Sequence, residues 1–160
     1  MIEIITGSLL DAKEKYIAHV TNAISITKAA GIARTIFDKY PYADCYADRT
    51  EQSKPGTIDI RGDGKDNRYI INMHAMVYPG RCRYPQSSLD GLAARQKYFY
   101  HCLLRVSKIV DLESVALPWR VGCSLAGGSW EHYLGQINLF ANHVDKQGVK
   151  VRIYRRSGDE

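Results

Sequence analysis

The sequence lacks a hydrophobic run long enough to cross a membrane, and it lacks a secretion signal. No apolar stretch in its 160 residues approaches the roughly 20 residues that a spanning helix needs. The first residues, Met1–Thr6, carry neither a basic segment nor a cleavage site and are typical of a strand. We therefore expect a protein of the cytoplasm or nucleus that is not secreted and has no membrane partner.

Cysteine patterns and cofactor motifs are also missing. Cys45, Cys82, Cys102 and Cys123 form no C-x-x-C pair or zinc-ligand spacing, so we expect free thiols and no metal site. The glycine-rich segments fit neither G-x-x-x-x-G-K-[ST] nor G-x-G-x-x-G, which argues against P-loop nucleotidases and dinucleotide oxidoreductases. The sequence implies no cofactor.

The composition is that of an ordinary globular domain with a basic bias. Hydrophobic residues make up 45% and charged residues 24%, and no repeat or linker divides the chain, so one domain over residues 1–160 is expected. The net charge of +5 favours an anionic partner. Arg81 and Arg83 are the mid-chain cations that we expect to contact a nucleic acid, if one is bound. The charges within Lys150–Arg156 are expected to form a solvated strand face.

Apolar runs alternate with helical patterns along the chain. Strands are predicted at residues 2–6, 17–21, 57–61, 68–74, 115–118 and 149–154, and helices at 29–40, 88–112 and 129–143. Ser129 is the predicted N-cap of the last helix. One face of the long middle helix is predicted to carry Leu92, Arg95 or Gln96, Phe99, Leu103, Val106 and Val110. Strands separated by helices need crossover connections, so the pattern predicts an α/β sheet with helices on both faces.

Two strand-to-helix junctions are rich in small residues. The first runs from Asn22 to Ala33, and the second, Gly122–Gly128, follows the strand at 115–118. In open α/β sheets, ligands bind where strands end and helices begin. Small residues let a ligand approach the backbone N–H groups at such helix starts. The pair of junctions therefore predicts a phosphate-containing ligand, although either loop alone would suit a simple tight turn.

The order of these motifs resembles that of the macro domain family, which binds ADP-ribose and its derivatives. The resemblance rests on I-T-G-S-L-L (5–10), I-A-H-V-T-N (17–22), A-G-I-A (30–33), R-Y-I-I-N (68–72), A-L-P (116–118), G-C-S-L-A-G-G-S-W (122–130) and V-R-I-Y (151–154). It implies a three-layer α/β/α fold with a mixed, mostly parallel sheet. The motifs are most similar to those of the ADP-ribose-1''-phosphate phosphatases and of the terminal ADP-ribose glycohydrolase type.

The resemblance also implies a set of site residues. Both small-residue loops would wrap the diphosphate, Trp130 would anchor the helix behind the second loop, and Asn22 would hold the distal ribose. The implied ligand-binding residues are Ser8, Leu9, Asn22, Lys28, Ala29, Ala30, Gly31, Ile32, Ala33, Gly122, Cys123, Ser124, Leu125, Ala126, Gly127 and Gly128. His19, Asn22 and His74 are the candidate catalytic residues. Residues 78–84 would form a mobile flap over the site.

The sequence departs from the family pattern at three informative places. Ser8 stands where relatives carry the aspartate that recognises adenine, and the nearby Asp11 is the only candidate substitute. Met76 and Ala126 occupy the positions of the lysine and aspartate of the terminal glycohydrolase type, which argues against that mechanism. Three functions stay open: a metal-independent hydrolase or phosphatase acting on an ADP-ribose derivative, a non-catalytic ADP-ribose reader, and a nucleic-acid-associated domain. A monomer is expected in each case.

Overall fold

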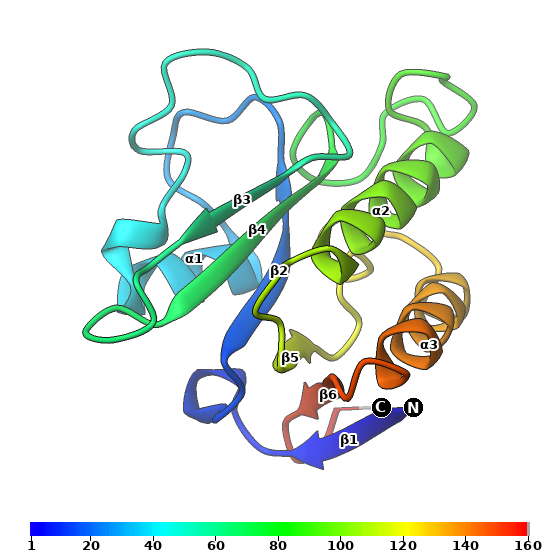
Figure 1. The fold of residues 1–160 in the computed structure, drawn as a ribbon. Helices are drawn as coiled ribbons and strands as arrows, with labels where there is room; N and C mark the ends of the chain where they lie inside the picture. Colours follow the sequence, from blue (N-terminus) through cyan, green and yellow to red (C-terminus); the bar gives the residue numbers. More distant parts are fainter. Residues whose placement is uncertain (160) are drawn as a thin grey trace.

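The computed structural model describes residues 1–159, which contain a six-stranded sheet (Figure 1). The strand order is β1-β6-β5-β2-β4-β3. Neighbouring strands pair in parallel except β3 and β4, which pair antiparallel. The strands are β1 (Ile2–Thr6), β2 (Tyr16–Asn22), β3 (Ile58–Arg61), β4 (Tyr69–Met76), β5 (Ser114–Pro118) and β6 (Lys150–Arg155).

Helices cover both faces of this sheet. The helices are α1 (Gly31–Lys39), α2 (Leu92–Ser107) and α3 (Trp130–Asp145), with short 3₁₀ helices η1 (Leu9–Asp11) and η2 (Pro41–Ala43). Side chains alternate along β2, so Ile17 packs in the core under α1 while Ala18 packs in the core under α2 and α3. Figure 1 shows the strands between α1 and the other two helices. The predicted three-layer α/β/α architecture is confirmed.

The helix boundaries differ from those predicted. The predicted helix 88–112 is too long at both ends, because the chain before Leu92 turns through backbone bonds from Gly91 N to Ser87 O and from Leu92 N to Pro85 O. Beyond Ser107, Val110 is fully exposed, so its predicted place on the apolar face of this helix is wrong. The predicted helix 29–40 begins at Gly31 instead, since Ala30 has an extended backbone.

The parallel arrangement gathers several loops at one edge of the sheet. Because β1, β2, β4, β5 and β6 run in the same direction, the segments that follow them leave from the same edge. This edge is where ligands bind in open α/β sheets. Within the described part of the chain, none of the helices has the length and hydropathy needed to traverse a bilayer.

Candidate functional site

A cavity of about 1120 Å³, here called the main cavity, lies at this edge of the sheet. Both small-residue loops contribute to its wall, together with the ends of β1 and β6 and the flap. The predicted ligand-binding residues found in the wall are Ser8, Leu9, Asn22, Lys28, Ala29, Ala30, Gly31, Ile32, Ala33, Gly122, Cys123, Ser124, Leu125 and Ala126. Gly127, Gly128, His19 and His74 do not line it. The fold thus brings together two loops that lie about ninety residues apart in the sequence.

The first loop presents the start of α1 to the main cavity. No side chain caps this helix, because its N-cap residue is Ala30. The first N–H groups of a helix have no intrahelical partner, and the helix dipole makes that end a site for anions. Gly31 has φ 62°, and a Cβ atom there would lie 2.7 Å from Leu125 Cδ1 in the second loop. The two loops are therefore in direct contact at Gly31.

The second loop is built differently from the first. Ser129 caps α3, its Oγ accepting from His132 N at 3.4 Å, so the start of this helix is occupied. A Cβ atom on Gly122 would lie 2.7 Å from Cε2 of Tyr133, and one on Gly128 would lie 2.7 Å from Gly122 O. These glycines permit close packing behind the loop. Amides of the intervening residues, rather than the α3 N-terminus, are the donors that this loop can offer a ligand.

Asn22 shapes the first loop as well as facing the main cavity. Its Oδ1 accepts from Ile24 N at 3.1 Å and from Ser25 N at 2.7 Å. Its Nδ2 donates to the Tyr46 hydroxyl at 3.1 Å, and that hydroxyl also accepts from Asn22 N at 2.9 Å. An amide nitrogen has two hydrogens, so one donor of Asn22 is left for a ligand. Tyr46, another residue of the wall, was not predicted from the sequence.

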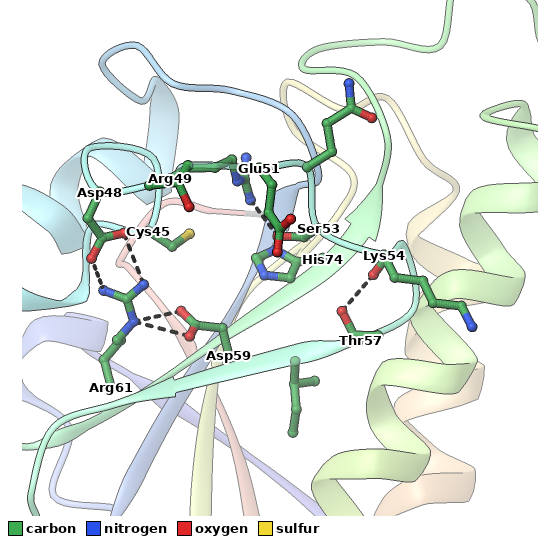
Figure 2. A pocket seen from close by; sticks show the side chains of 13 residues that line it. Cys45, Asp48, Arg49, Glu51, Ser53, Lys54, Thr57, Asp59, Arg61 and His74 are labelled. Carbon is green, nitrogen blue, oxygen red and sulfur yellow. Dashed lines mark hydrogen bonds and ion pairs between the residues drawn. The ribbon is translucent and has the colours of Figure 1, made fainter.

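The two candidate catalytic histidines lie in the interior. His19 is fully buried, contacts the Phe37 ring edge-on at 5.3 Å, and bonds Asn72 Oδ1 through Nε2 at 2.6 Å. His74 bonds Thr21 Oγ1 at 2.8 Å and faces a different, smaller cavity (Figure 2). Burial lowers the pKa of both imidazoles to about 4. Neither histidine reaches a ligand placed in the main cavity.

A buried ion pair, not predicted from the sequence, ties the flap to the second loop. Arg95, on the inner face of α2, forms a two-pronged pair with Asp90, the shorter contact being 2.7 Å from Nη2 to Oδ2. Its remaining N–H groups donate to the carbonyls of Tyr78, Gly80 and Ala126 at 3.0, 2.6 and 3.3 Å. The flap, predicted to be mobile, is thus fastened to the wall. An arginine within an apolar helical stripe was the signal available in the sequence.

Other predicted features of the site have more modest structural roles. Ser8 caps η1, its Oγ accepting from Leu10 N at 3.2 Å, while Asp11 lies outside the wall of the main cavity. The Cys123 thiol is buried, which raises its pKa to about 11 and suits a packing role. Trp130 packs edge-on against Trp119 at 5.1 Å, behind the second loop. Besides Tyr46, the unpredicted wall residues include Arg120, Tyr154, Arg156 and Asp159.

Solved structures of macrodomains share this fold. The chain aligns with the macrodomain of Mycobacterium tuberculosis DarG at a TM-score of 0.73 and 22% identity, covering 96% of this chain and 97% of that one. The macrodomain of Thermus aquaticus DarG gives 0.72 and 21%, covering 97% and 98%. An Oceanobacillus iheyensis macrodomain solved with ADPR gives 0.68 and 15%, covering 96% and 84%. No protein-family model and no curated protein sequence matches the chain. The chain has the macrodomain fold.

Proposed function

We propose that the main cavity binds ADP-ribose or a derivative of it. The observation that carries this proposal is the meeting of the two small-residue loops at Gly31 and Leu125, within one cavity. A diphosphate between these loops would accept from the uncapped first turn of α1 on one side and from loop amides on the other. The Oceanobacillus iheyensis macrodomain, solved with ADPR, adds support through its shared fold.

Calorimetry with the intact chain tests the proposal directly. ADP-ribose is expected to bind measurably, and AMP and ribose 5-phosphate, which each lack part of the diphosphate bridge, are expected to bind more weakly. The comparison matters because the three compounds carry similar negative charge, so a nonspecific basic surface would bind them about equally. No heat of binding at millimolar ADP-ribose would remove the proposed function.

Replacing Asn22 with aspartate is expected to weaken ADP-ribose binding by about 1–2 kcal/mol, the scale of a lost hydrogen bond. Aspartate keeps the oxygen that accepts from Ile24 N and Ser25 N, but it loses the amide donor and places a negative charge in the wall. Calorimetry would measure the affinity, and a thermal melt would check that the loop is intact. Unchanged affinity in a folded variant would mean that Asn22 does not touch the ligand.

We favour a binding module without turnover over an enzyme that uses a histidine for catalysis. His19 and His74 lie outside the wall of the main cavity, so catalysis there would rely on a phosphate of the bound compound and a water molecule. Release of phosphate from ADP-ribose-1''-phosphate is the assay that separates the hypotheses. Catalytic release above the rate without protein would favour the phosphatase, and binding without release would favour the reader.

Nucleic-acid contact is a further hypothesis, centred on the flap. Arg81 packs against Gly127 of the second loop, and the Arg83 guanidinium lies 6.0 Å from the centre of the Tyr84 ring. Both arginines are exposed, and neither lines the main cavity. If they contact phosphates, replacing each with glutamine should reduce the slope of log affinity against log salt by about 1 for an oligonucleotide. Lys146→Gln, on the exposed end of α3, is the matched control, and an equal change there would remove the flap from the interface.

A further inference from the structure

A second cavity, of about 430 Å³ and here called the small cavity, adjoins the loop that carries Asn22. Its wall is formed by Cys45 and residues 48–54, by β3 with the residue before it, and by His74 of β4 (Figure 2). No residue lines both cavities. They are nevertheless neighbours, because Arg49 of the small cavity donates to the carbonyls of Asn22 and Ser25, which line the main one. A volume of this size suits a small ligand.

His74 presents an unused ring nitrogen to the small cavity. The side chain is only 3% exposed, and Nδ1 is engaged with Thr21 Oγ1 at 2.8 Å. Nε2 has no hydrogen-bond partner among residues 1–159, although the imidazole lines the cavity. Nε2 is accessible from the cavity, since it is not among the fully buried polar atoms that have no partner. It can therefore form a hydrogen bond with a ligand atom in the cavity.

Arg49 brings a charge that no acidic side chain neutralises. Three of the five N–H groups of its guanidinium are used, donating to Ser25 O at 2.9 Å, Asn22 O at 3.0 Å and Ser53 Oγ at 3.1 Å. The Nε hydrogen and one Nη1 hydrogen are left over. No carboxylate of residues 1–159 lies within ion-pair distance of Arg49, whereas Arg61 contacts both Asp48 and Asp59.

The carboxylates among the other charged wall residues outnumber the cations, so an anion here would be held by the local position of Arg49 and His74 rather than by a net positive wall. Asp48 and Asp59 are already bound to Arg61, at 2.8 and 2.9 Å. Glu51 and Lys54 are exposed at the wall, and neither has an ion-pair partner among the described residues. We propose that the small cavity is a second binding site, for a phosphate-type oxyanion held by Arg49 and His74 with Lys54 at its mouth. An arginine and an imidazole that donate from different elements suit an oxyanion with several oxygens.

The experiment is a titration of the full chain with inorganic phosphate, followed residue by residue by NMR. Signals of His74 Nε2 and Arg49 Nε are expected to shift and saturate, and to do so equally when excess ADP-ribose is present. Phosphate in the main cavity would instead move Gly31 and Leu125, and ADP-ribose would suppress that response. The responses of the two cavities are therefore measured separately. If one proposed site fails to bind, binding at the other can still be measured.

Exposed wall residues supply variants that leave the fold undisturbed. Lys54→Gln is expected to weaken phosphate binding at His74 about threefold, and Glu51→Gln to strengthen it about threefold, as befits single exposed charges. Lys65→Gln, on the exposed turn between β3 and β4, removes the same charge elsewhere and should leave this affinity unchanged. An equal effect of the Lys54 and Lys65 substitutions would mean that phosphate responds only to the net charge of the protein, and this would overturn the proposal.

Two further results would also overturn it. One is a response of His74 and Arg49 that does not saturate, or that sodium chloride at the same ionic strength reproduces. The other is saturable binding of methylguanidinium with shifts at Glu51 and Asp59, which would make the small cavity a site for cations.

Discussion

Replacing Arg95 with methionine is expected to lower the free energy of unfolding by about 3–5 kcal/mol, the cost typical of removing one partner from a buried ion pair. The Asp90 carboxylate would stay buried, since its side chain is only 8% exposed, without the cation that compensates it. Two backbone donors, Val77 N and Tyr78 N, would still hold it in place. Denaturant titration of the wild type and variant measures the difference.

The matched control is Arg105→Met, the same substitution on the exposed side of the same helix. It is expected to change stability by no more than about 0.5 kcal/mol, as surface substitutions do. Arg95→Lys keeps the charge but not the planar guanidinium, so its loss of stability should lie between those of Arg95→Met and Arg105→Met. This variant should also bind ADP-ribose more weakly than the wild type. A loss below 1 kcal/mol for Arg95→Met would mean that Asp90 is not held as a buried charge.

The layers of this fold could be predicted from the sequence because buried strands and helices have recognisable local patterns of apolar residues. Ile17 and Ala18 belong to a strand buried on both faces, and such strands are apolar throughout. The two small-residue loops were also predictable, since both lie where a parallel strand passes into a helix. The prediction that they line one cavity needed only the rule that such loops share an edge of the sheet.

The functional details depended on contacts between residues far apart in the sequence, which no local pattern indicates. The carbonyls that Arg95 binds, of Gly80 and Ala126, lie far from it in sequence and can belong to any residue type. His19 lies on the same face of β2 as Ile17, but whether that face meets solvent depends on Phe37 of α1. Similarly, nothing local distinguishes a glycine that lines a cavity, such as Gly122, from Gly128, which packs behind the loop.

The second large effect is expected from acid, through the two buried histidines. The pKa of His19 and of His74 is about 4 in the folded chain, against an ordinary value of 6.5, and burial is the main cause in each case. Below pH 6.5 both imidazoles are therefore protonated in the unfolded chain. In the folded chain they become protonated only near pH 4. Stability is complete above pH 6.5 and falls as the pH drops through this window, by about 3 kcal/mol for each histidine.

The three carboxylates whose pKa is clearly shifted do not account for the same window. Hydrogen bonds and nearby cations lower the pKa of Asp48, Asp63 and Asp111 below their ordinary 3.8, so their contribution is lost only at more acidic pH. Urea titrations between pH 7 and pH 4 should therefore follow the histidines. Acid destabilisation in the wild type is expected to have a slope of up to about 2.7 kcal/mol per pH unit, the value for two protons.

Histidine variants assign that slope to particular side chains. His19→Gln retains an N–H that can donate to Asn72 Oδ1 but cannot take up a proton, so it should halve the slope while costing some packing energy at pH 7. His143→Gln, at an exposed position near the end of α3, should leave the slope at its wild-type value. An unchanged slope in His19→Gln would mean that this imidazole is protonated within the fold, and hence that water or a ligand reaches its buried Nδ1. That result would reopen a catalytic role for His19, because an imidazole that exchanges protons must communicate with solvent.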